Sequence, residues 1–312
     1  MKLLRIKIRM LSGGRTPLHS DTLFGSICWA ILYLEGEAKL KYLLQKVNGD
    51  MPVFILSNGF PSGFLPRPAG GNYAVRRAKG LSKDDLINSM TTAKKEKQIT
   101  YIPVDDIQRL IQGEKIDLKD SKQPEEVCIH LTTHNTINRM TGTSAEGGLF
   151  RETYRWDGDV DIYALVEEEW QPLLMQCLEL IGVWGYGGGA SHGRGAFEIE
   201  AVYDANFELP VDSNAYMTLS RCIPTSEMPV QCQYKLDVKY GRFGQKRSKN
   251  GYPFKRPVLM LEPGAVFWSK PPECGWGGAV AGNLSNEYTD ALQSGLSIIL
   301  PCRTDPPEWG VE

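Results

Sequence analysis

The chain has 312 residues, of which 42% are hydrophobic and 10% aromatic, so it can bury a substantial core and is long enough for two domains. Its formal net charge of −2 argues against a uniformly basic nucleic-acid-binding protein, so any RNA affinity must come from local patches or partners. Seven scattered cysteines without a Cys-x-x-Cys pair argue against a disulfide framework and against a cysteine zinc site. Charged residues interrupt the apolar ones over residues 1–10, which predicts a cytoplasmic protein without membrane contact.

Alternation of apolar and cationic residues predicts a strand at the start of the chain, where Leu4, Ile6, Ile8 and Met10 alternate with Arg5, Lys7 and Arg9. The cationic face fits either a solvated sheet edge or an RNA-facing sheet, and both interpretations stay open. A helix follows, capped by Ser20 or Asp21, with apolar residues at three- and four-residue intervals up to residue 34. Asp21 is expected to interact with the helix dipole and not with a metal.

Residues 53–56 predict a second strand, after which prolines, glycines and mixed charge over residues 58–126 indicate an insertion or a mobile arm. Strand-like segments return at 127–132, 151–156 and 162–166, followed by a helix that begins near Trp170 and a strand from Phe197. Without the insertion, the order is β-α-β followed by β-α-β. This is the ferredoxin-like arrangement, which RNA-recognition modules share.

The segment 182–195 has seven glycines in fourteen residues, which leaves a backbone that a ligand can approach closely. A helix precedes it and a strand follows it, the reverse of the order in P-loops and dinucleotide-binding motifs. What remains is a run of backbone N–H donors beside Ser191, His192 and Arg194, suited to a phosphodiester backbone. A surface turn without function is the alternative.

The second half of the chain has a different pattern. Beyond about residue 210, short alternating strands without a strongly periodic helix predict a mostly β domain. Residues 239–256 include a run of cations without an acid, which indicates either a basic patch or a solvated loop. We therefore predict an α+β fold with an N-terminal domain at 1–208 and a C-terminal domain at 209–312.

Three segments resemble the RAMP superfamily of CRISPR effector proteins. The first is the glycine-rich segment, and the second is His134–Phe150 followed by Arg151, which resembles the Arg-x-Thr-Gly segment of these proteins. The third is residues 19–31, which are similar to the first helix of the subunit that holds the crRNA 5′ handle in type III-A complexes. Residues 251–257 and 264–267 resemble the C-terminal half of the same subunit.

The resemblance implies two ferredoxin-like, RRM-like domains, the second mostly β, with a thumb-like insertion in the first. It implies a non-catalytic, RNA-binding subunit of a type III-A ribonucleoprotein in antiviral defence, without a cofactor or a metal. The implied partners are crRNA through its 5′ handle, the large polymerase-like subunit, the backbone RAMP subunit and, indirectly, target RNA.

The residues expected to contact RNA fall into four groups. Backbone contacts are assigned to Gly187, Gly188, Gly189, Ser191 and Gly193, with Arg194 as the charged anchor. His19 and Ser20 stand where the first strand meets its helix, and Arg139 and Arg151 flank the second motif. His192 lies in the glycine segment, and Lys255 and Arg256 lie in the basic run.

Two other classes of function remain open. A metal-independent RAMP endoribonuclease that processes crRNA precursors would use histidines to activate a ribose 2′-hydroxyl, and His19 with His192 is the pair available. The second class is a scaffold that contacts proteins and little RNA. The RNA-binding interpretation also allows a RAMP subunit of another type III complex.

Overall fold

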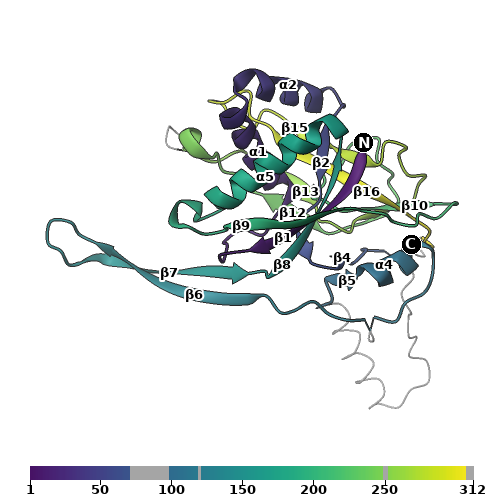
Figure 1. Ribbon diagram of the computed structural model, residues 1–312, viewed down its shortest axis with the longest axis horizontal. Helices are drawn as coiled ribbons and strands as arrows, with labels where there is room; N and C mark the ends of the chain where they lie inside the picture. Colours follow the sequence, from purple (N-terminus) through teal and green to yellow (C-terminus); the bar gives the residue numbers. More distant parts are fainter. Residues whose placement is uncertain (71–97, 119–120, 249–251, 307–312) are drawn as a thin grey trace, which may run out of the picture.

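The computed structural model describes residues 1–70, 98–118, 121–248 and 252–306. It is a mixed α/β structure with two five-stranded sheets and three two-stranded sheets (Figure 1). One five-stranded sheet comes from the N-terminal half of the chain and the other from the C-terminal half.

The N-terminal sheet has the strand order β2-β8-β1-β9, formed by β1 (Lys2–Met10), β2 (Phe54–Leu56), β8 (Asp159–Val166) and β9 (Phe197–Asp204). Helix α1 (Ser20–Leu34) connects β1 to β2, and α5 (Gln171–Trp184) connects β8 to β9. All pairings in this sheet are antiparallel. The β-α-β order predicted for both parts of this half is therefore present, with the predicted strand at 162–166 inside β8.

The two faces of β1 differ as the alternation predicts. Leu4, Ile6 and Ile8 are at most 1% exposed beneath the helices. On the other face, Arg5 lies 2.8 Å from the Asp161 carboxylate. The remaining cations there pair with carboxylates of β8 and β9: Lys7 with Asp159 and Glu200, and Arg9 with Glu198 and Glu200.

The interpretation of β1 as a sheet edge is wrong, because β1 pairs with strands on both sides. Its cations are matched by carboxylates of the neighbouring strands, so this face has no excess positive charge to attract a phosphate backbone.

Parts of the predicted insertion belong to the body of the protein. Strand β3 (Phe60–Pro61) joins β8, and β4 (Phe64–Pro66) pairs with β5 (Tyr101–Pro103), which leads into α4 (Val104–Ile111). Ile102 and Ile107 are fully buried in the main core. A mobile arm is therefore wrong for the flanks of the segment, and residues 71–97 lie outside the described part of the chain. Helix α2 (Glu37–Asn48) was not predicted at all.

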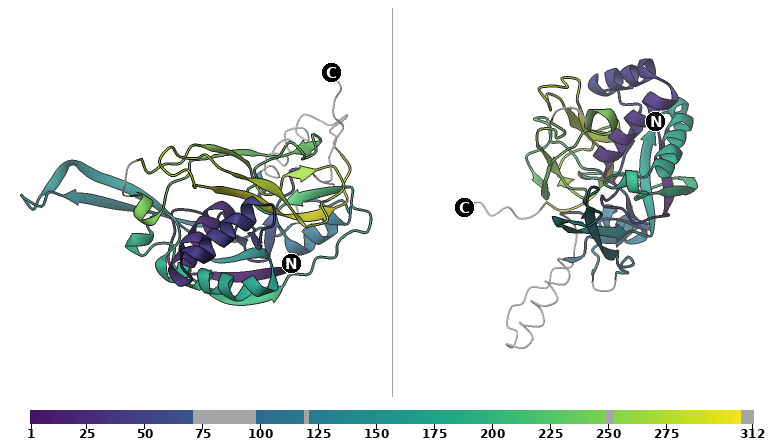
Figure 2. Two further views of the ribbon diagram at one scale, coloured as in Figure 1. Left: turned by 90° about the horizontal axis from the view of Figure 1, so that it is seen from above. Right: turned by 90° about the vertical axis from the view of Figure 1, so that its left-hand side faces the viewer.

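Strands β6 (Cys128–Ile137) and β7 (Ser144–Trp156) form a long hairpin that extends away from the body (Figures 1 and 2). The predicted strands at 127–132 and 151–156 thus pair with each other and do not enter the N-terminal sheet. The hairpin leaves the body next to the first loop of the chain, where Gly14 bridges Arg155 of β7.

The C-terminal half is mostly β, as predicted. Its large sheet has the order β11-β14-β10-β16-β15, formed by β10 (Ala215–Thr218), β11 (Cys232–Gln233), β14 (Val266–Phe267), β15 (Trp276–Ala281) and β16 (Gln293–Cys302). A small sheet joins β12 (Leu236–Lys239) to β13 (Val258–Leu261). Among the described residues after 204, the helical structure is the 3-10 turn η3 (Gln245–Ser248).

One hydrophobic core joins the two halves. Helix α1 packs against α5 on one side and against β16 on the other, and Ile27 shares its core cluster with Leu296 and Ile298. At the start of α1, the buried Asp21 carboxylate accepts a hydrogen bond from Gln293 at 2.9 Å and lies 2.9 Å from the Lys239 ammonium. Asp21 thus has a structural role, but its partners are side chains of the C-terminal half. The helix begins after His19 and has no side-chain cap, so the predicted cap by Ser20 or Asp21 is wrong.

The seven cysteines are all free thiols. Cys177, Cys222 and Cys302 are buried core residues, whereas Cys128 and Cys274 are exposed. In the described part of the chain, no helix is long and apolar enough to cross a membrane.

Candidate nucleic-acid interface

The glycine segment between α5 and β9 forms a packed loop, which includes the 3-10 turn η2 (Ala190–His192). Gly187 and Gly195 have positive φ angles of 75° and 70°. A Cβ atom would lie 2.6 Å from Thr16 at Gly187 and 2.2 Å from the Tyr186 carbonyl oxygen at Gly195. Glycine is required here because the loop presses against its own backbone and against the β1–α1 loop.

Several of the N–H donors in this loop form hydrogen bonds within the protein. The Gly188 amide donates to the Thr16 hydroxyl at 3.1 Å, and the Gly193 amide donates to the Ala190 carbonyl at 3.0 Å. The amides of Gly187, Gly189 and Ser191 form no hydrogen bond within the part of the chain that the structure describes. These three donors are thus free to bind a ligand.

Arg194 lies beside the base of the β6–β7 hairpin. Its guanidinium stacks 3.9 Å from the centre of the Tyr154 ring, and the Tyr154 hydroxyl donates a hydrogen bond to Glu152. Arg15, from the β1–α1 loop, donates to the same carboxylate at 2.9 Å. The hydrogen bond from Tyr154 lowers the pKa of Glu152 below its usual value.

These contacts define a glycine-loop surface, which consists of Arg15, Glu152 and residues 187–194 and lies over the buried ring of Tyr154. Two arginines face one carboxylate there, so the surface is locally cationic although the chain is slightly acidic. Sequence reasoning missed Arg15 and Tyr154. The Gly-Gly-Arg run at residues 13–15 was the available signal, because glycines before a cation resemble the pattern of the glycine segment itself.

His192 is exposed at the edge of this surface, where its Nδ1 lies 3.3 Å from the Ser191 hydroxyl. Arg151 is an exposed neighbour of Glu152 on β7, and strand alternation directs it to the opposite face of the hairpin. Arg139 lies in the exposed turn at the hairpin tip. The two arginines that flank the second motif therefore stand at different places along the hairpin and do not form one clamp.

His19 and Ser20 are held at the start of α1. The His19 amide donates to the Tyr186 hydroxyl at 3.0 Å, and the Ser20 amide donates to the Asn58 side chain at 3.0 Å. Burial, and secondarily the positive charge of Arg221, lowers the pKa of His19 to about 4. The environment of His19 therefore disfavours the protonated form of its ring.

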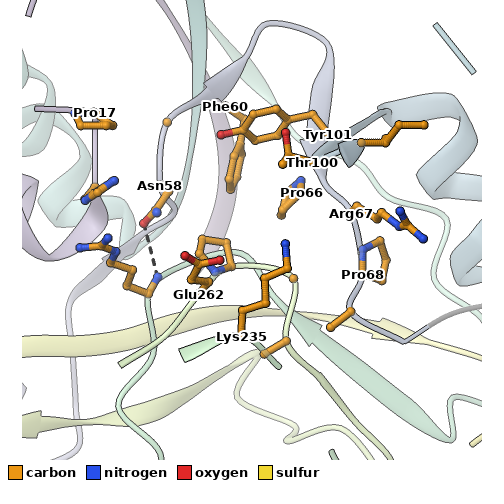
Figure 3. A pocket seen from close by; sticks show the side chains of 18 residues that line it. Pro17, Asn58, Phe60, Pro66, Arg67, Pro68, Thr100, Tyr101, Lys235 and Glu262 are labelled. Carbon is orange, nitrogen blue, oxygen red and sulfur yellow. Dashed lines mark hydrogen bonds between the residues drawn. The ribbon is translucent and has the colours of Figure 1, made fainter. Parts of the chain in front are cut away.

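His19 also lines a cavity of about 460 Å³ between the two halves of the chain (Figure 3). Proline and aromatic side chains form much of its wall, and Arg67, Lys235 and Glu262 reach it from three segments. The Nδ1 atom of His19 is buried there without a hydrogen-bond partner among the described residues.

The side chains of Lys255 and Arg256 form hydrogen bonds within the C-terminal half. The Lys255 ammonium donates to the Leu292 carbonyl at 2.7 Å, and burial lowers its pKa. Arg256 donates to the Asn283 carbonyl at 3.0 Å and to the Asn286 side chain. Neither cation contacts the glycine-loop surface in the described structure, so the predicted RNA contacts do not form one site. The described residues also contain no cluster of side chains suited to a metal ion.

The sequence that forms this fold matches a known protein class. The family model of the RAMP superfamily matches residues 7–198, which span the N-terminal sheet, the hairpin and the glycine loop. The chain belongs to the RAMP superfamily, so the resemblance inferred from the sequence is confirmed.

The more particular similarity is to Csm4. The CRISPR system Cms protein Csm4 of Thermococcus onnurineus (strain NA1) is 25% identical over 275 residues, which cover 84% of this chain and 89% of the relative. A solved chain of the Csm3–Csm4 subcomplex of the type III-A interference complex has a TM-score of 0.61 at 16% identity and covers 97% of this chain and 100% of its own. A chain of the Csm1–Csm4 cassette with pppApA has a TM-score of 0.59 at 18% identity, with coverage of 98% and 100%. These structures share the fold of this chain.

Proposed function

We propose that this chain is the RNA-binding subunit of a type III-A CRISPR ribonucleoprotein that holds the 5′ handle of the crRNA and acts without catalysis. The glycine-loop surface is the observation that carries this proposal, because it combines free amide donors with two fixed arginines in a RAMP fold. Single-stranded RNA needs such donors and cations for its phosphates and open surfaces for its splayed bases.

Each part of the surface has a role in this proposal. The amides of Gly187, Gly189 and Ser191 bind phosphate oxygens, and Arg194 supplies the positive charge. Stacking on Tyr154 restricts the guanidinium of Arg194, so less conformational freedom is lost when RNA binds. His192 contributes an exposed donor at the rim, and Arg139 and Arg151 bind phosphates further along the hairpin.

The domain assignment is part of the proposal. The strand order β2-β8-β1-β9 with two helices supports a ferredoxin-like domain over residues 1–208. The region 209–312 would be a second ferredoxin-like domain that has lost its helices. The β6–β7 hairpin would supply the thumb-like extension, since β3, β4, β5 and α4 of the predicted insertion belong to the body.

The partners follow from the similar proteins. In the similar solved structures, Csm4 is combined with Csm1 in one and with Csm3 in the other. For this chain we propose a large polymerase-like subunit and a backbone RAMP subunit as protein partners, crRNA as the direct ligand and target RNA as an indirect one. The complex would act in the cytoplasm in antiviral defence, and the subunit would need no cofactor.

The dependence of RNA affinity on salt tests the proposal. We expect Arg194→Ala to weaken binding of a single-stranded RNA that carries the 5′ handle and to reduce the slope of log K against log salt by about 1. Arg109→Ala is the matched control, because Arg109 is an exposed, ion-paired arginine on α4. Equal slopes for both variants and the wild type would contradict the assignment of Arg194 as a phosphate ligand.

The endoribonuclease alternative has its own test. Purified protein and the His19→Ala/His192→Ala double variant are incubated with precursor RNA and a chelator, and the products are resolved on a gel. We expect intact RNA with both proteins. If the wild type cleaves the RNA and the double variant does not, the protein is an endoribonuclease and the proposed non-catalytic function is wrong.

A further inference from the structure

The C-terminal half exposes a group of aromatic side chains near the start of α1. Tyr240 and Tyr252 are 72% and 71% exposed, and Phe254 is 46% exposed. Arg242, also exposed, forms an isolated antiparallel bridge with Phe254. We call these four residues the aromatic surface.

The aromatic surface is fixed by what lies beneath it. Phe243, the inward neighbour of Arg242, is buried, and its amide donates to the Pro253 carbonyl at 2.9 Å. The Lys255 amide donates to the Gly241 carbonyl at 2.8 Å. On the outside, the rings of Tyr252 and Phe254 lie 5.5 Å apart at 61°, and the Arg242 guanidinium lies 5.9 Å from the Phe254 ring. The rings of Tyr252 and Phe254 are thus held side by side next to the Arg242 guanidinium.

The chemistry of this surface matches nucleobases. Exposed aromatic rings forgo the stabilisation of burial, and a guanidinium beside them adds the positive charge that a phosphate backbone requires. Asp237, three residues before Tyr240, pairs with Arg221, so its charge is compensated. Aromatic rings combined with cations are the arrangement on which single-stranded nucleic acids stack.

The segment before the aromatic surface and the glycine segment both form hydrogen bonds with the start of α1. Tyr240 directly follows Lys239, whose ammonium donates to the Thr22 hydroxyl on α1 at 2.7 Å. Three residues earlier, the His19 amide contacts the Tyr186 hydroxyl of the glycine segment. Both surfaces are therefore anchored to the first turn of α1, one through the Tyr186 hydroxyl and the other through the Lys239 ammonium.

We propose that Tyr240, Arg242, Tyr252 and Phe254 form a second RNA site, which stacks unpaired bases of the RNA that the glycine-loop surface holds by its phosphates. This inference rests on the proposed function for the identity of the ligand. It divides recognition into a phosphate-binding surface on the N-terminal half and a base-stacking surface on the C-terminal half.

Removal of the bases tests this division. The full-length chain is titrated by fluorescence anisotropy with a single-stranded RNA of about 12 nucleotides, and with the same strand made abasic. We expect Tyr240→Ala and Tyr252→Ala each to weaken binding of the ordinary RNA by about 5- to 100-fold and to leave binding of the abasic strand unchanged. Tyr252→Phe should retain the wild-type affinity, and Val211→Ala, at a fully exposed position, is the control.

The outcomes separate this inference from the proposed function. Arg194→Ala should weaken binding of both strands, because its contact is with phosphate. If Arg194→Ala weakens binding and the tyrosine variants do not, the second site is wrong while the RNA-binding function stands. If none of the variants changes affinity, both fail. Tyrosine variants that bind RNA normally but lose a purified protein subunit of the complex would make the aromatic surface a protein interface and overturn the inference.

Discussion

His19 stands where a protonated ring is unfavourable. Its Nδ1 is buried and has no hydrogen-bond partner among the residues that the structure describes, and the neighbouring Arg221 adds positive charge. The folded protein therefore holds the ring neutral down to a pH of about 4, whereas an unfolded chain binds a proton near pH 6.5. The energetic role of His19 is thus to make the junction between the two halves sensitive to acid.

This position predicts a pH dependence of stability. Between about pH 6.5 and 4 the unfolded state binds more protons at His19, so the free energy of unfolding should decrease as pH falls, by at most about 1.4 kcal/mol per unit. Urea denaturation across this range measures the slope, which His19→Gln should reduce. His192→Gln, at an exposed position, is the control. An unchanged slope in His19→Gln would contradict the burial argument.

The glycine loop is rigid because its glycines meet other parts of the protein. Gly187 and Gly193 both have φ angles near 75°, but only Gly187 lies against a neighbouring side chain, Thr16. A side chain at either position would suffer the same backbone strain, but only one at Gly187 would also clash with a neighbour. Comparing the two positions therefore separates the cost of strain from the cost of the clash.

The pair gives a matched test of packing in the loop. Gly193→Ala should cost about 1–2 kcal/mol from the left-handed backbone alone, since among the described residues no atom beyond its two chain neighbours lies within 4 Å of the added Cβ. Gly187→Ala should cost more, because its Cβ would lie 2.6 Å from the Thr16 side chain. Chemical denaturation of both variants checks this order, and equal losses would show that the loop can move away from the β1–α1 loop.

Much of the fold was predictable at the level of elements, because strongly periodic segments such as β1 and α1 carry their own signal. The elements missed were short or mainly exposed. Strands β4 and β5 have three residues each beside prolines, and α2 has only two buried residues. The pairing of β6 with β7 depends on tertiary contacts that alternation does not encode.

The candidate site was predictable in part. The glycine loop could be found from composition, but Tyr154 reaches Arg194 only after the hairpin folds against the loop. Lys255 was predicted to contact RNA because it lies in a basic run. In the structure its ammonium is hydrogen-bonded inside the protein, which the sequence does not reveal. Charge patterns indicate where cations stand in the chain and say nothing of which ones are already paired.

At the scale of the whole molecule, the shared core predicts that the two halves unfold together. Ile27 of α1 and Ile298 of β16 are buried in the same cluster, so Ile→Ala at either position should remove about 2–5 kcal/mol from the entire molecule. Far-ultraviolet circular dichroism and tryptophan fluorescence should report one coincident transition in the wild type and in each variant. Val211→Ala, at an exposed position, should change neither signal. Two separated transitions would contradict a common core.

The order of strands along the chain has a consequence for synthesis. Strand β1 leaves the ribosome first, but it pairs with residues 159–166 and 197–204, and α1 packs against β16 at residues 293–302. Nascent chains therefore expose the apolar faces of β1 and α1 until residues 293–302 have been made, and such non-local pairings are slow to form. Translation products that stop before β16 should be targets for chaperones and proteases.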